Sequence, residues 1–206
     1  MLAAYKELLP RYRRYFFTAT TLFLLGLGLG IAAAIYNPEL IAEAFKMIGE
    51  QLERLGEDIL GSPVEQGIKI LFWHNLRAVL LVVFLGLALG VYPAFSMLFN
   101  GMIIGVVGVV SVGSASLAAF LAGIVPHGIF EIPGLLLGAA IGLRLGLGPL
   151  LSRKKSAFAI SGPTTWKGYG QELRDAVILL TLAVLLLAVA AVIEVVVTPY
   201  LIQFWL

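Results

Sequence analysis

The residues of this chain best suited to chemistry are a histidine and a glutamate four positions apart, His127 and Glu131. Residues four apart on a helix share one face, so this pair can form a hydrogen bond, relay a proton or provide two ligands to a divalent metal. Two ligands do not make a metal site, and the others would have to come from His74, a water or a second subunit. We therefore favour a structural pair and assign no metal, no cofactor and no catalytic residue.

The pair lies among residues that interrupt helices: Pro126, Gly128 and Pro133. Proline lacks the backbone N–H that a helix uses, so these residues are expected to act as a hinge. The surrounding stretch 115–151 is too long for one straight membrane helix and too short for two. It predicts a half-helix, a broken or re-entrant segment near 126–133, and then a full helix.

Other polar side chains within the apolar runs are candidate partners for Glu131. A charge near the centre of a membrane helix costs roughly 2.5–3.5 kcal/mol, so it needs a partner, an aqueous cavity or a role. Asn75 and Asn100 stand at span entrances, where helix capping or an interhelical hydrogen bond accounts for each. Arg77 either neutralises Glu131 or extends to the membrane surface. We predict that His127 and Glu131 reach each other or one of these three residues.

The composition is that of an integral membrane protein. Of the 206 residues, 60% are hydrophobic and 13% are charged, against roughly a quarter charged in soluble domains, and the mean hydropathy is +1.00. The apolar stretches are continuous over about 20 residues, which excludes the alternating strands of a barrel. The absence of cysteine excludes thiolate sites and disulfides, and no nucleic-acid motif accompanies the basic residues. We predict one all-α membrane domain spanning residues 1–206.

Charge distribution predicts the direction of the spans. The apolar runs are 16–36, 76–91, a third from about 98, 115–151 and 175–198, giving about five net crossings. Four basic residues precede the first run, and five lie in the loop 152–174, so both segments are expected to be cytoplasmic at the cell membrane. The C-terminus is then external. Arg144 is expected to extend to the inner surface or else to neutralise Glu131. Glu194 is expected to reach the outer surface and is assigned no role.

The external segment is predicted to contain an amphipathic helix, 38–60. Pro38 stands at its start and Gly61 follows its end. Apolar residues recur in steps of three and four as a partner-facing stripe: Ile41, Phe45, Ile48, Leu52, Leu55 and Ile59. The polar face is acidic, whereas helices on membrane surfaces favour lysine and arginine. The stripe therefore contacts protein, either this subunit's own outer face or a second subunit or envelope protein.

Glycines recur at four-residue spacing inside the apolar runs. The series are Gly26 and Gly30, Gly86 and Gly90, Gly101 and Gly105, and Gly134, Gly138, Gly142 and Gly146. Such a glycine zipper gives one helix face a smooth groove, which lets two helices in lipid pack closely. The alternative use of the groove is a ligand path.

Several of these residues together resemble the stage II sporulation protein M family of integral membrane proteins. The resemblance rests on Asn75, Gly90, Pro93, Asn100-Gly101 and the stretch Pro126-His127-Gly128 with Glu131 and Pro133. In endospore formers it implies a scaffold for the engulfment complex, beside a peptidoglycan-cleaving lytic transglycosylase and an amidase, the stage II sporulation proteins D and P. Many relatives occur in organisms that never sporulate, so the resemblance implies the fold more firmly than the function.

The leading hypothesis is a non-enzymatic, homodimeric scaffold in the lipid bilayer that organises envelope or peptidoglycan-remodelling partners. The chain has no Ser-His-Asp set, phosphate loop, dinucleotide fingerprint or HExxH motif. The alternative is a small dimeric transporter or channel that uses His127 and Glu131 at a broken helix. A metal-dependent intramembrane hydrolase ranks third. A polar cavity open to one side would favour transport, and a dry, paired site would favour the scaffold.

The predicted topology can be tested in this cysteine-free chain with the single substitutions Glu50→Cys and Ile160→Cys. A membrane-impermeant thiol reagent should label position 50 only from outside and position 160 only after the membrane is opened, because the basic loop stays inside. Labelling of both positions from the same side would contradict the assignment.

Overall fold

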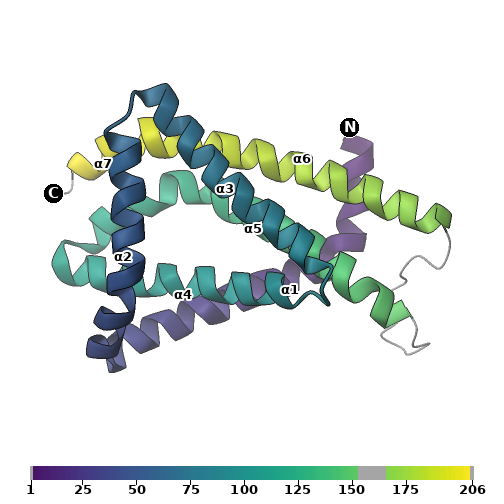
Figure 1. Cartoon of the computed structure of the whole chain (residues 1–206), viewed down its shortest axis with the longest axis horizontal. Coiled ribbons are helices and arrows are strands. Elements are labelled where there is room, and N and C mark those ends of the chain that lie inside the picture. The colour runs from purple at the N-terminus through teal and green to yellow at the C-terminus, as the bar shows by residue number, and fades with distance from the viewer. Residues whose placement is uncertain (1, 153–165, 205–206) are drawn as a thin grey trace.

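The structure is a computed structural model that describes residues 2–152 and 166–204, and these residues form seven α-helices and no strand. The helices are α1 (Leu2–Tyr36), α2 (Pro38–Leu60), α3 (Val64–Gly86), α4 (Val91–Ser114), α5 (Leu117–Ser152), α6 (Trp166–Val196) and α7 (Thr198–Gln203) (Figure 1). The predicted all-α fold is confirmed. Of the predicted basic loop 152–174, residues 153–165 lie outside the described part, and residues 166–174 form the beginning of α6 instead of a loop.

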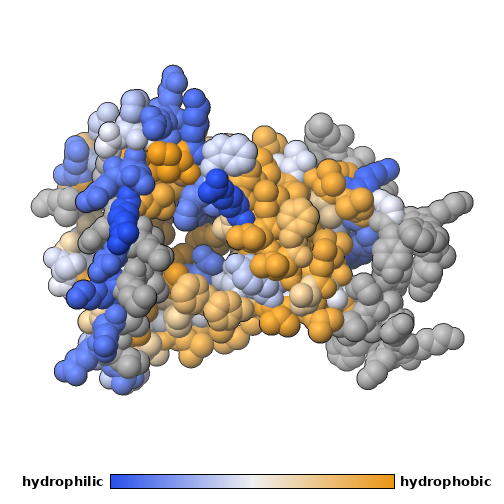
Figure 2. Space-filling view, in the orientation of Figure 1, coloured by the Kyte–Doolittle hydropathy of each residue, from blue (hydrophilic) through white to orange (hydrophobic). Residues whose placement is uncertain are grey.

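Five of the helices are long and apolar enough to cross a membrane, as predicted. The candidate spans are Pro10–Tyr36, Val64–Gly86, Val91–Ser114, Leu117–Gly148 and Gly170–Val196. Their outward side chains include large apolar groups such as Phe84 and Leu185, which are 65% and 58% exposed. Figure 2 shows this hydrophobic surface over the long helices, with hydrophilic residues gathered over α2 and the turn that follows it. The exposed apolar surface matches a lipid environment.

Helices α1 and α4 pack through reciprocal glycines. A Cβ atom added to Gly26 would overlap the carbonyl oxygen of Leu98 on α4, and one added to Gly101 would overlap that of Phe23 on α1. Gly30 and Gly105 repeat this arrangement one turn further along. The two backbones therefore touch without intervening side chains, which is how helices gain contact in lipid.

Helix α5 lies at the centre of the bundle because its own glycines admit three neighbours. A Cβ atom on Gly134 would stand 3.3 Å from the Ala183 carbonyl oxygen of α6, and one on Gly138 would stand 2.9 Å from Val79 of α3. At Gly142 it would approach Val82 of α3 and Pro93 of α4 at 2.5 and 2.7 Å. The glycine face of α5 thus meets protein on α3, α4 and α6.

The predicted interruption near 126–133 is not observed. Helix α5 continues over 36 residues, and Figure 1 shows that it changes direction in the part that follows α4. A proline inside a helix removes one hydrogen bond and crowds the preceding turn, which bends the helix without ending it when neighbouring groups satisfy the backbone. A straight helix of this length would span about 54 Å, well beyond the roughly 30 Å hydrocarbon core, so bending and tilting fit it to the membrane.

Helix α2 has the bounds that the sequence predicts and crosses one end of the bundle, from the end of α1 to the start of α3 (Figure 1). Ile41, Leu55 and Ile59 of the apolar stripe are half-buried. Ile59 packs against Gly67 of α3, where an added Cβ atom would stand 3.4 Å from its side chain. The side chains of the other three stripe residues, Phe45, Ile48 and Leu52, lie outside the described part. The half-buried members contact this subunit itself.

Glycine packing between α1 and α4 gives a direct test with a matched control. Gly101→Leu should destabilise the protein by about 1–3 kcal/mol, because the new side chain overlaps the α1 backbone. Gly28→Leu should have little effect, since no atom lies within 4 Å of a Cβ at this exposed position. The measurement is the apparent melting temperature in detergent. Equal melting temperatures for the two variants would show that the α1–α4 contact is not this close.

Candidate functional site

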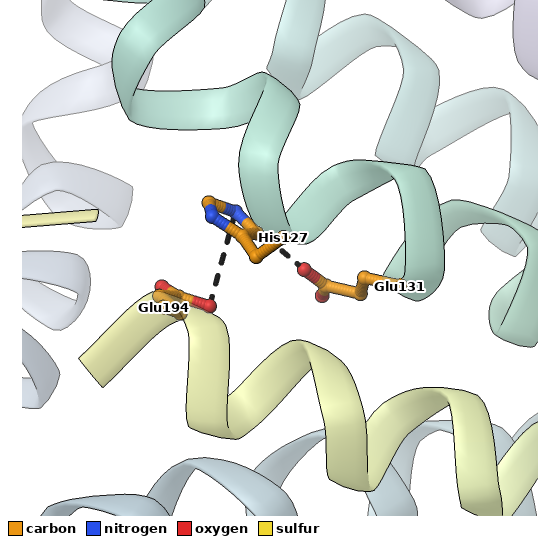
Figure 3. Close-up of side chains that lie close together, drawn as sticks. All are labelled: His127, Glu131 and Glu194. Atoms are coloured by element: carbon orange, nitrogen blue, oxygen red, sulfur yellow. Dashed lines mark ion pairs between the residues drawn. The ribbon is translucent and has the colours of Figure 1, made fainter. Parts of the chain in front are cut away.

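A cluster of polar side chains joins α5 to the junction of α6 and α7. Helix α5 contributes His127 and Glu131, α6 contributes Glu194, and Thr198 begins α7. His127 Nε2 lies 3.8 Å from a carboxylate oxygen of Glu131 and 3.8 Å from one of Glu194 (Figure 3). Its other ring nitrogen, Nδ1, lies 3.4 Å from the Thr198 hydroxyl. One histidine therefore faces two carboxylates and is held from behind by a hydroxyl.

The sequence predicts part of this arrangement. His127 and Glu131 share a face of α5 as expected, but His127 Nε2 and the carboxylate oxygen are 3.8 Å apart, which is too far for the predicted hydrogen bond. Glu194, expected only to reach the membrane surface, is instead a member of the cluster. It is the only charged residue after Asp175, and a lone carboxylate in an apolar run is itself a signal of function.

The cluster is partly open. The side chains of His127, Glu131 and Glu194 are 12%, 23% and 32% exposed, and Thr198 is buried. The arrangement is therefore neither a dry buried pair nor a surface group. The imidazole is the most enclosed of the three side chains, and the two carboxylates are more exposed.

The predicted partners Asn75, Asn100 and Arg77 do not take part. Within residues 2–152 and 166–204, no hydrogen bond or ion pair joins any of them to His127 or Glu131. Asn100 donates to the Ser96 carbonyl of its own helix at 2.8 Å. Asn75 is buried on α3, and its amide nitrogen has no hydrogen-bond partner among the described residues. Helical periodicity predicts which residues share a face of one helix. It does not predict which other helix that face contacts, so these partners could not be predicted from spacing.

Arg77 instead lines a cavity between α2 and α3. The cavity has a volume of about 580 Å³ and is lined by Leu55, Gln66, Lys69, Ile70, Trp73, His74 and Arg77. His74 and Arg77 are exposed, and Leu55 belongs to the half-buried stripe of α2. His74, considered from the sequence as a further metal ligand, therefore belongs to this cavity and not to the His127 cluster.

A second polar network lies at the opposite end of α5 and centres on Arg144. The sequence predicts that Arg144 extends to the inner membrane surface, and the structure shows the residue buried by protein groups, at only 8% exposed. Its guanidinium binds both carboxylate oxygens of Glu172 on α6, with Nε 2.5 Å from Oε2. It also donates to the Arg11 carbonyl at 2.6 Å and lies 4.7 Å from the centre of the Tyr12 ring. Bidentate pairing and stacking suit a guanidinium withdrawn from water.

Helix α1 joins the Arg144 network through a further ion pair. Arg11 contacts Asp175 at 2.8 Å, and the Asp175 side chain is 4% exposed. Together these contacts fix α1, α5 and α6 to one another at this end of the bundle. Buried pairs of this kind fix geometry, since removing one partner leaves the other charge without compensation.

The two polar groups are far apart along the helices that carry them. At roughly 1.5 Å per residue, α5 rises about 25 Å between His127 and Arg144, and α6 rises about 33 Å between Glu172 and Glu194. These lengths are close to the roughly 30 Å thickness of the hydrocarbon core of a bilayer. The two groups therefore belong to opposite ends of the α5–α6 pair.

The fold and the two polar groups define a class: a multi-pass helical membrane protein whose long helices pack through glycines and are tied by charged groups at both ends. Within this class, the chain belongs to the family described as Stage II sporulation protein M, whose pattern matches residues 19–199. It is 30% identical over 130 residues to "Uncharacterized protein MJ0793" of Methanocaldococcus jannaschii, covering 61% of this chain and 67% of that protein. No solved structure matches.

The Arg144 network predicts a large difference between two arginine substitutions. Arg144→Gln should lower the free energy of unfolding by about 3–5 kcal/mol, because Glu172 is left buried without its partner. Arg54→Gln removes an exposed partner of Glu50, whose side chain lies 3.7 Å away, and should change stability by no more than about 1 kcal/mol. The apparent melting temperature in detergent measures the stability of both variants. A wild-type melting temperature for Arg144→Gln would show that the network carries little stability.

Proposed function

We propose that this protein is a non-enzymatic membrane scaffold. It uses the exposed face of α2 to hold envelope proteins against the outer surface of the cell membrane. The observation that carries this proposal is the position of α2. A polar helix of 23 residues lies across the end of a bundle of membrane helices and is held by contacts with α1 and α3. A rigid element presented at a membrane boundary is suited to binding another protein.

The charge of α2 supports a protein partner over a lipid partner. Its exposed acidic residues outnumber its exposed basic residues, Lys46 and Arg54. The exposed acidic residues are Glu39, Glu43, Glu50, Glu57 and Asp58. Anionic lipid headgroups repel such a face, whereas a basic protein surface is attracted to it. We therefore propose a partner with a basic docking surface.

The proposed orientation follows from the basic residues of the sequence. It places the N-terminus in the cytoplasm, α2 outside the cell membrane and the C-terminus outside. Membership of the Stage II sporulation protein M family supports envelope or peptidoglycan-remodelling proteins as the partners. A homodimer, as the sequence analysis expects, remains part of this proposal and presents two copies of α2 side by side.

Transport is the second candidate function, and the polar cluster of His127, Glu131 and Glu194 is the observation that favours it. Proton and ion pathways through membranes are built from titratable groups within apolar helices. The packing of α5 opposes this function, because the stretch between the two polar groups is filled by closely packed glycine and alanine. The scaffold is therefore the better-supported proposal.

Site-specific photo-crosslinking in native membranes tests the scaffold directly. A photoreactive amino acid at position 43 or 57 of α2 should yield adducts with discrete proteins, while the same group at Phe84, exposed on the lipid-facing side of α3, should not. The charge reversals Glu43→Lys and Glu57→Lys should reduce the adducts made from the other α2 position several-fold. Mass spectrometry identifies the partner, and an adduct with a second copy supports the homodimer.

Two outcomes would contradict the scaffold. The first is an adduct pattern from α2 that is no different from that of position 84. The second is proton or ion flux in reconstituted vesicles that the folded wild-type protein supports and folded Glu131→Gln abolishes, since this substitution keeps shape and removes only charge. That result would establish transport as the function.

A further inference from the structure

We propose that His127, Glu131 and Glu194 bind one divalent transition-metal ion of the Zn²⁺ type. One ligand atom from each residue lies within 4.8 Å of the others, and the set combines an imidazole from α5 with carboxylates from α5 and α6. This inference does not depend on the scaffold proposal, because the residues are on helices other than α2.

The spacing of the three residues fits a metal better than it fits direct pairing. His127 Nε2 lies 3.8 Å from both carboxylates, which is beyond a hydrogen bond to either. Ligand atoms around a tetrahedral zinc ion with bonds of about 2.1 Å stand roughly 3.4 Å apart. Small side-chain rotations therefore bring these atoms to coordination distance without any movement of the backbone.

Thr198 orients the imidazole as a ligand. Its hydroxyl lies 3.4 Å from the Ile193 carbonyl, to which it donates, so its lone pairs are free to accept. His127 Nδ1, also 3.4 Å from that hydroxyl, is then the protonated nitrogen and donates to it. Nε2 keeps its lone pair and faces the two carboxylates. A hydrogen bond on the far nitrogen is the usual second contact of a metal-binding histidine.

Charge balance supports a dication at this position. Among the described residues, neither Glu131 nor Glu194 pairs with a lysine or arginine, and His127 is the one basic side chain that faces them. One divalent ion neutralises both carboxylates and removes the repulsion between them. An imidazole nitrogen among the ligands selects a first-row transition metal over Mg²⁺ or Ca²⁺, which prefer oxygen alone.

The exposure of the ligands and their number also suit a zinc ion. Glu131 and Glu194 are 23% and 32% exposed, so the surrounding helices do not seal either carboxylate. Three protein ligands leave the remaining positions to water, as in zinc sites that are not fully enclosed. The bound ion would join the bent part of α5 to the end of α6.

The test uses the full chain, purified in detergent with any affinity tag removed, stripped with a chelator and titrated with ZnCl₂. We expect one Zn²⁺ per chain by calorimetry and elemental analysis. His127→Gln, Glu131→Gln and Glu194→Gln should each weaken binding at least tenfold, and Thr198→Val should weaken it by about 10–100-fold. His74→Gln, which changes the histidine of the α2–α3 cavity, should leave binding unchanged.

A second readout keeps the test valid if a variant fails to fold. Zn²⁺ should raise the melting temperature of the wild type, because an ion that binds only the folded state stabilises it, and Co²⁺ should give visible absorption bands of low-symmetry coordination. Absence of stoichiometric binding and of these bands in the wild type would overturn the proposal. So would binding that His74→Gln abolishes, or that folded Glu194→Gln retains in full.

Discussion

The contacts of α1 with α4, and of α5 with α3, α4 and α6, depend on how closely backbones can approach, because lipid offers no hydrophobic gain when two apolar helices meet. Gly26 and Gly101 let α1 and α4 touch, and the glycines of α5 let it receive α3, α4 and α6 at once. The central part of α5 is accordingly fully buried at Ala139, Ala140 and Ile141. A bundle built on such contacts has little freedom at its centre, so its polar groups are found towards the ends.

Those polar groups hold α5 and α6 in register at two levels. Arg144 and Glu172 form a bidentate pair towards one end of the bundle, and His127 lies between Glu131 and Glu194 towards the other. The two levels differ in chemistry. The guanidinium of Arg144 is fully engaged by a carboxylate and a carbonyl, whereas the second level has one imidazole for two carboxylates. Only this second level has unused ligand capacity, and this is why it, and not the Arg144 network, is the candidate for binding.

Local sequence rules predicted the elements well and their partners poorly. Pro38, Gly61 and the three- and four-residue apolar steps gave the bounds of α2, because capping and periodicity act within one helix. The break near Pro126 was wrong because surrounding helices keep α5 continuous through its prolines. The partners Glu172 for Arg144 and Glu194 for His127 lie 28 and 67 positions away in sequence, and no spacing rule reaches across helices. The four-residue spacing predicted that the glycines share one face of a helix. It did not predict which helices that face would contact.

The polar cluster is also placed where it affects the element proposed to bind partners. Val195 follows Glu194 and packs against Gly67 at the start of α3, and Gly67 in turn contacts Ile59 at the end of α2. The turn between α2 and α3 is therefore close to Val195, the residue that follows Glu194 of the cluster. Because α2 is held by contacts with α1 and α3, any interaction that fixes Glu194 also fixes one of the two supports of α2. The cluster is thus connected by packing to one support of α2, and the proposed ion would stiffen that support.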